Sequence, residues 1–265
     1  MNRAPLTSLL VAATFLLFPR TTTAQAGGTD VYWHIDPSVK SCSMVIDPSL
    51  TQAQWKRFAE QAGAIISFKP LASAEPLGKH NVTVGLDYSS TAVDQRDPAW
   101  INTFTHPDET CPLGDHVVVP TLRARVGVSD RMDFGASWTK APRANYGYVS
   151  GEVRYALLAE TAHRPAAAVR TSMTVLTGVP DFNYIEYGAE WSASKRLAAF
   201  TPFLGTRGNF AVATETTSKV DLRQERLFLP QAFIGTTYSV WKFDLAAEYD
   251  IAKVNTIALI VGVRP

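Results

Sequence analysis

Hydrophobic and polar residues alternate with a period of two over most of the chain beyond residue 80. In "KFDLAAEYDI", residues 242–251, the charged side chains occupy alternate positions, and Phe243, Leu245, Ala247 and Tyr249 occupy the positions between them. Successive side chains of a β-strand point to opposite faces, so this segment is predicted to be a strand with one charged and one uncharged face. The same pattern predicts ten strands, over residues 80–90, 116–128, 131–139, 146–158, 166–177, 183–194, 199–212, 227–240, 241–251 and 255–264.

The lengths of these strands and of their connections favour a membrane barrel. Most of the predicted strands have about ten residues, as a tilted membrane-spanning strand does, whereas strands of globular proteins average about five or six. The joins at "SDR", "SKRL" and "SVWK" are tight, while residues 91–115 and 213–226 form long polar loops. If the last strand ends in the periplasm, the three tight joins lie on the periplasmic side and both long loops lie outside.

The charged face of these strands is rich in arginine and carboxylates, which form fixed bidentate pairs in a confined space. We therefore expect a charge network in the barrel lumen, made of Asp87, Arg123, Arg125, Asp133, Glu152, Arg154, Arg170, Glu186, Glu190, Arg207, Lys242, Asp244, Glu248 and Asp250. The opposite face is uncharged on most strands, as contact with lipid requires. Its large aromatic residues predict a girdle at the membrane interfaces, made of Trp138, Tyr155, Tyr187, Trp191, Trp241 and Tyr249.

Residues 80–265 thereby resemble the integral outer-membrane β-barrel proteins of Gram-negative bacteria, as "MDFGASWTK", "NYIEYGAEWSAS" and "KFDLAAEYDI" illustrate. The likeness is one of architecture, and no motif of a named family is present. It implies an all-β fold with a single closed antiparallel transmembrane β-barrel of about 10 to 12 strands. It also implies a location in the cell outer membrane, contact with outer-membrane lipid and insertion by the outer-membrane assembly machinery.

The first 79 residues are predicted to form two further parts. Residues 1–26 have the pattern of a cleaved signal peptide, because an apolar run of about 13 residues is too short for a membrane anchor, which needs about 20. Residues 27–79 are predicted to be a periplasmic segment or a plug of the lumen. Loss of Arg3 and Arg20 with the signal peptide takes the net charge from +1 to −1, which gives no reason to expect a nucleic-acid partner.

One helix is predicted within this N-terminal segment, in "PSLTQAQWKRFAEQAG". Ser49 and Gln52 suggest a capping box, Trp55 and Phe58 lie on one helical face, and Gly63 is the expected stop. The following "AIISF" has the pattern of a further short strand.

The two cysteines, Cys42 and Cys111, are predicted to form a disulfide in an exported chain, with two separate thiols as the alternative. Because Cys111 falls in a predicted outside loop, such a bridge requires the N-terminal segment to cross the lumen as a plug. Neither cysteine has a histidine at metal-ligand spacing, so no metal site and no cofactor are expected.

Three functions are consistent with this pattern. The first is a non-enzymatic, structural or porin-like protein for restricted passage and transport of small solutes, whose identity the sequence leaves unknown. The second is a soluble periplasmic or secreted β-barrel that binds an apolar ligand inside. The third is an outer-membrane hydrolase that uses His106 or His116, although no nucleophile motif accompanies either histidine. We expect no catalytic residue.

Overall fold

The computed structural model describes residues 43–104, 115–141 and 144–264 of the chain. The predicted signal peptide, the Cys42–Cys111 disulfide and His106 lie outside these residues.

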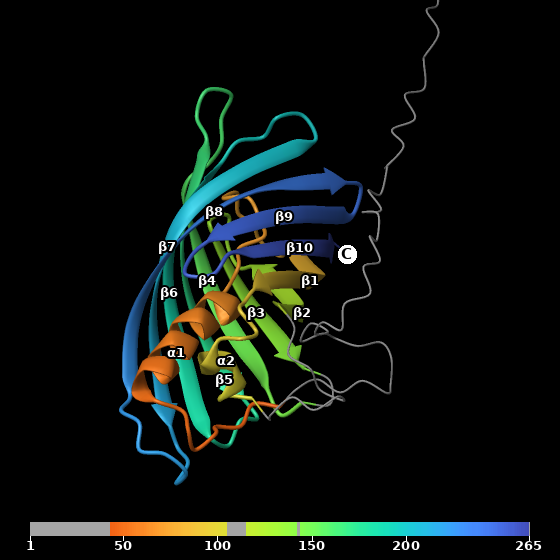
Figure 1. Ribbon diagram of the computed structural model, residues 1–265. Helices are drawn as coiled ribbons and strands as arrows, with labels where there is room; N and C mark the ends of the chain where they lie inside the picture. The colour runs from red at the N-terminus through yellow and green to blue at the C-terminus, as the bar shows by residue number, and fades with distance from the viewer. Residues whose placement is uncertain (1–42, 105–114, 142–143, 265) are drawn as a thin grey trace, which may run out of the picture.

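A closed antiparallel barrel of ten strands makes up most of the described chain (Figure 1). The fold class and the ten strands predicted from the sequence are confirmed. Each strand pairs with the next along the chain, and β1 pairs with β10 to close the barrel. The strands are β1 (Val82–Ala92), β2 (His116–Gly127), β3 (Met132–Lys140), β4 (Gly147–Leu158), β5 (Ala166–Thr177), β6 (Phe182–Ser194), β7 (Phe200–Glu215), β8 (Glu225–Val240), β9 (Phe243–Ile251) and β10 (Thr256–Val263).

The connections divide between the two ends of the barrel. We call the end that carries the β1–β2, β3–β4, β5–β6, β7–β8 and β9–β10 connections the loop end, and the opposite end the turn end. The two longest connections, β1–β2 and β7–β8, both start and finish at the loop end. Residues 128–131, 195–199 and 241–242 make short turns at the turn end. The two long connections and the three tight joins lie at the predicted ends. The sorting is incomplete, because the loop end also has short connections at 178–181 and 252–255 and the turn end a longer one at 159–165. The assignment of the loop end to the outside remains a prediction.

The wall has an apolar outer surface and a polar inner one. On β1, the side chain of Leu86 is 57% exposed, whereas its neighbour Asp87 is 3% exposed. The same alternation continues around the barrel, so the large apolar side chains of the strands face outward. A soluble barrel with an apolar interior would show the reverse order.

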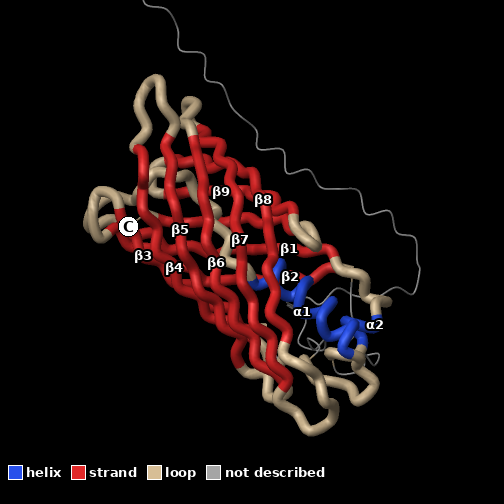
Figure 2. The backbone as a smooth tube through the Cα atoms, turned by 90° about the vertical axis from the view of Figure 1, so that its left-hand side faces the viewer, coloured by secondary structure: helices blue, strands red, loops and turns tan. Residues whose placement is uncertain are grey.

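A helix, α1 (Gln52–Ile66), lies at one mouth of the barrel beside the short helix α2 (Pro98–Ile101) (Figures 1 and 2). Two details of the predicted helix were wrong. The capping box is made by Thr51 and Gln54, and the helix continues past Gly63 to Ile66, so no strand forms in "AIISF". Gly63 is kept small by tertiary contact, because a Cβ atom there would lie 2.3 Å from Leu229 Cδ1 and 2.5 Å from the Tyr184 hydroxyl.

The loop end of the lumen is filled by an apolar core around α1. The Phe58 ring meets Trp100, Phe104 and Phe182 edge-to-face, with ring centroids 5.2, 6.4 and 5.7 Å away. Such contacts add to the hydrophobic gain of burying large rings. Tyr184 adds a hydrogen bond from its hydroxyl to the Ala59 carbonyl, 2.8 Å long. The helix is thus packed inside the barrel wall rather than suspended outside it.

No helix in the described ranges has both the length and the apolar character needed to cross a membrane.

Candidate functional site in the barrel lumen

Four arginines of the inner wall make buried ion pairs with carboxylates on other strands. Arg123 Nη2 lies 2.5 Å from Asp87 Oδ2, and Arg154 pairs with Asp133. Arg170 Nε lies 2.7 Å from Glu152 Oε2, with Glu190 Oε1 at 3.4 Å from Nη1. Arg207 Nη2 contacts both Glu248, at 2.9 Å, and Asp250, at 2.5 Å. Each arginine charge is thus compensated by a carboxylate of another strand.

Residues 67–77, which we call the lumen segment, pass between these ion pairs from the end of α1 toward the start of β1. The wall donates to three of its carbonyls near the middle of the barrel: Arg207 Nη1 to Phe68, and Arg123 Nη1 to Lys69 and Pro70. Arg154 then donates to the Ser73 and Glu75 carbonyls, each at 2.6 Å. The contacts come from β2, β4 and β7, so the segment is held from several sides.

The lumen segment's N–H groups are bound by the wall in the same way. Leu71 N–H donates to Glu248 Oε2 at 2.8 Å, Ala74 N–H to Ser194 Oγ at 3.0 Å, and Leu77 N–H to Asp133 Oδ1 at 3.1 Å. The segment contains no helix or strand that would satisfy its own backbone groups. Because an unpaired buried backbone group costs as much as a lost hydrogen bond, the wall's charged side chains replace water as its partners.

The Phe68 ring adds an aromatic contact at the centre of the lumen. Arg123 Cζ lies 4.4 Å and Arg170 Cζ 5.6 Å from its centroid, which is cation–π distance. An aromatic side chain is therefore enclosed by cations that already have carboxylate partners.

Most residues of the predicted charge network are buried on the inner wall: Asp87, Arg123, Asp133, Glu152, Arg154, Arg170, Glu186, Glu190, Arg207, Glu248 and Asp250. The structure places the remaining three differently. Arg125 and Asp244 are half-buried, and Lys242 lies exposed in the turn between β8 and β9. The partner of Asp244 is Arg264, with Nε 3.0 Å from Oδ2. By strand parity Lys242 would point to the inner face, but it lies outside the strand because β9 begins at Phe243.

The predicted aromatic girdle residues are all exposed: Trp138, Tyr155, Tyr187, Trp191, Trp241 and Tyr249. Trp241 is the most exposed of them, at 81%, and lies in the β8–β9 turn with a φ of 53°. Their role as an interfacial girdle remains a prediction.

Among the described residues, Lys69 is the one buried charge of the lumen that the sequence pattern did not predict. Its ammonium donates to the Ile65 carbonyl at 2.8 Å and to the Ser67 carbonyl at 3.2 Å, where it caps the C-terminal end of α1. Burial lowers the pKa of this ammonium, and the nearby Asp250 carboxylate opposes the shift. No periodicity marks Lys69, because the lumen segment is neither a helix nor a strand.

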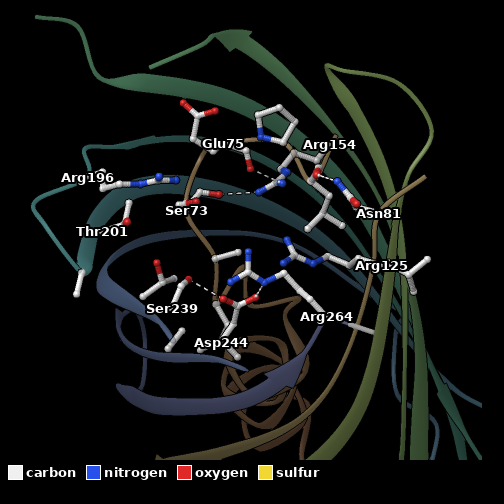
Figure 3. Close-up of a pocket in the computed structure, with 18 of the residues that line it drawn as sticks. Ser73, Glu75, Asn81, Arg125, Arg154, Arg196, Thr201, Ser239, Asp244 and Arg264 are labelled. Carbon is white, nitrogen blue, oxygen red and sulfur yellow. Dashed lines mark hydrogen bonds and ion pairs between the residues drawn. The ribbon is translucent and has the colours of Figure 1, made fainter. Parts of the chain in front are cut away.

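A cavity of about 570 Å³ lies at the turn end, beyond the lumen segment (Figure 3). Four arginines line it: Arg125 and Arg154 from the strands, Arg196 from the β6–β7 turn and Arg264 after β10. Glu75 and Asp244 are its acidic residues, and Figure 3 shows Asp244 linked to both Arg264 and Ser239.

A second hollow marks a gap in the wall next to α1. The β8–β9 pairing begins at Ala232 opposite Ile251, so β8 extends seven residues beyond it toward the loop end, over 225–231. A hollow of about 460 Å³ here is lined by Glu60 and Ala64 of α1 and by Phe228 and Ile251 of the outer surface. It therefore joins the apolar exterior to the helix inside.

The described residues give little support for a hydrolytic site. His116 Nδ1 lies 3.0 Å from Asp115 Oδ1, but both side chains are largely exposed at the start of β2. Within the same residues, no group of three or more histidine, cysteine, aspartate or glutamate side chains is placed to hold a metal ion.

Comparison with known proteins adds solved structures of low similarity. No family model and no curated protein matches the chain. Neisserial surface protein A is 14% identical over 69% of this chain and 95% of its own, with a TM-score of 0.30. An outer membrane channel from Pseudomonas putida F1 is 9% identical over 75% of this chain and 100% of its own, with a TM-score of 0.44. The outer membrane protein OprG from Pseudomonas aeruginosa is 8% identical over 73% and 96%, with a TM-score of 0.30. At these values no activity is carried over to this chain.

The closed barrel, the apolar outer surface and the charges turned inward define an integral outer-membrane β-barrel protein. The resemblance drawn from the sequence is confirmed at this level.

Proposed function

We propose that this protein is a non-enzymatic outer-membrane barrel for restricted passage of small solutes, in which residues 43–79 act as a plug. The main support for this proposal is that Arg123, Arg154 and Arg207 bind the backbone of the lumen segment from different sides of the wall. A segment so held inside a barrel of ten strands, which leaves room for only a narrow lumen, supports its role as a plug.

The nature of these contacts supports a lumen segment that can move away from the wall, while α1 stays packed in its apolar core. Each arginine that binds the segment also has a carboxylate partner on the wall, so its charge stays compensated when the segment moves away. Water would then take over the hydrogen bonds to the released backbone, which makes the exchange far less costly than exposing unpaired charges. A purely structural barrel filled with apolar side chains would lack this property.

Solute uptake into proteoliposomes tests the proposal. A variant that lacks residues 43–77 should admit small neutral solutes such as glycerol and arabinose much faster than the wild type, and should exclude a large dextran. Retention of the folded barrel is checked by its heat-dependent mobility on a denaturing gel. A folded deletion variant as impermeable as protein-free vesicles would refute passage and leave a structural role.

The gap beside β8 favours a second candidate, entry of an apolar molecule from the bilayer toward the interior. Its carrying observation is that Phe228 and Ile251 of the outer surface and Ala64 of α1 line one hollow. Binding of the fluorescent apolar probe N-phenyl-1-naphthylamine should then fall in Ala64→Phe, which fills the hollow, and stay unchanged in Ala53→Phe on the exposed face of α1. Equal binding by both variants would dismiss this candidate.

A further inference from the structure

Arg125 differs from the other four arginines of the inner wall in making no ion pair. Among the described residues no carboxylate lies within 4.0 Å of its guanidinium, and its Nη1 is buried without a hydrogen-bond partner. Glu152, a carboxylate on the same inner face, pairs with Arg170 through Oε2 and acts on Arg125 only from beyond 4.0 Å. A guanidinium nitrogen left buried and unpaired is costly, so its presence beside a cavity needs an explanation.

The other charges of the turn-end cavity do not provide that counter-charge. Asp244 is held by Arg264 and by the Ser239 hydroxyl, which donates at 2.6 Å. The Glu75 carboxylate accepts from the backbone N–H of Glu160 at 2.6 Å. Arg196 makes no ion pair within the described ranges, and Figure 3 shows it across the cavity from Arg125. Arg125 and Arg196 therefore both line the cavity without an ion-pair partner among the described residues.

The size and lining of the cavity restrict what can fill it. Its volume of about 570 Å³ far exceeds that of a single inorganic anion. Beside the arginines its wall offers the hydroxyls of Thr201 and Thr237 and the apolar side chains of Leu71 and Ala246. A guanidinium binds a carboxylate with two parallel hydrogen bonds, while the apolar wall favours a carbon skeleton behind the carboxylate.

We propose that the turn-end cavity is a binding site for a small organic carboxylate, whose carboxylate group is bound by Arg125 and approached by Arg196 at the mouth. The site is complete with the lumen segment in place, because Leu71 and Glu75 of that segment line it. Binding there therefore does not depend on whether the plug moves or any solute crosses.

Isothermal titration of the detergent-solubilised full chain with succinate tests this site. Neutral succinamide is the control ligand, and inorganic phosphate tests the alternative that any oxyanion is accepted. Succinate should bind the wild type and succinamide should not. Arg125→Gln should weaken succinate binding about tenfold or more, as expected for loss of a charge-assisted pair. Arg131→Gln, an exposed arginine of the β2–β3 turn, is the matched control and should bind as the wild type does.

A second variant keeps the proposal testable if Arg125→Gln does not fold. Ala199→Trp places a large side chain in the cavity from an exposed position of the β6–β7 turn, and should abolish succinate binding without disturbing the wall. Undiminished binding in either variant would overturn the site. Absence of succinate binding to the wild type, or binding of phosphate in its place, would overturn the assignment to carboxylates.

Discussion

Arg154 and Asp133 stand directly opposite one another on β4 and β3, and together they bind both donors and acceptors of the same stretch of lumen segment. Arg154 donates to the Ser73 and Glu75 carbonyls at 2.6 Å, and Asp133 accepts from the Leu77 N–H at 3.1 Å. The ion pair is therefore a two-sided clamp on the backbone. Its charges cancel with or without the segment, while its geometry suits an extended chain.

The clamp predicts the effect of shortening Arg154. Arg154→Lys keeps the charge opposite Asp133, but an ammonium cannot reach two carbonyls and a carboxylate in the planar arrangement of a guanidinium. We expect amide hydrogen exchange at residues 73–77, of which Pro76 has no amide hydrogen, to become about tenfold faster, consistent with the loss of about one or two hydrogen bonds.

Arg131→Lys, at an exposed position of the adjoining turn, is the control for the general effect of replacing arginine by lysine. Exchange rates at residues 73–77 that match in both variants would show that the clamp does not hold the segment.

The outer surface predicts a strong penalty for charge at its centre. Leu86 lies midway along β1 and faces outward, so Leu86→Arg should reduce the free energy of folding into lipid vesicles by about 2 to 4 kcal/mol. Val128→Arg, in the turn after β2, should cost much less because its guanidinium reaches water. Equal and small penalties at both positions, measured by urea titration in vesicles, would mean that this surface does not face lipid.

Lys69 predicts a pH dependence with a definite sign. Burial lowers the pKa of its ammonium in the folded protein, while the unfolded chain keeps the ordinary value of 10.5. Between the lowered pKa and 10.5 the unfolded state binds more protons, so the contribution of Lys69 to the free energy of unfolding rises with pH.

Other groups titrate in this range, so the measurement is a difference between two proteins. The free energy of unfolding of the wild type minus that of Lys69→Met should rise as the pH increases from 8 toward 10.5. A difference that stays flat or falls over this window would contradict a buried ammonium at this position.

The barrel wall was predictable because the alternation of apolar and polar residues within each strand shows which side chains share a face. The alternation around Leu86 and Asp87 is local, and a strand's parity assigns its charges to one side without knowledge of its partners. The same reasoning fails where a strand ends. Strand parity alone places Lys242 in the lumen. The residue instead lies in the turn that begins at Trp241, and no sequence pattern reveals the positive φ of Trp241.

The lumen segment was not predictable in its path. Its bonds join Phe68 to Arg207 and Leu71 to Glu248, residues separated by 139 and 177 positions, and they run from side chain to backbone. Backbone groups are the same in every residue, so no residue type in the segment marks them. The prediction that Gly63 ends the helix was wrong for a related reason. A glycine is present there to leave room for the side chains of Leu229 and Tyr184.

Single-molecule conductance in planar bilayers tests the central claim, that the lumen segment closes the barrel, most directly. The wild type should show no steady conductance at low applied voltage, and the folded variant without residues 43–77 should show stable open channels. Steady conductance of the same size in both proteins would contradict the claim, because the segment would then leave the conducting path unobstructed.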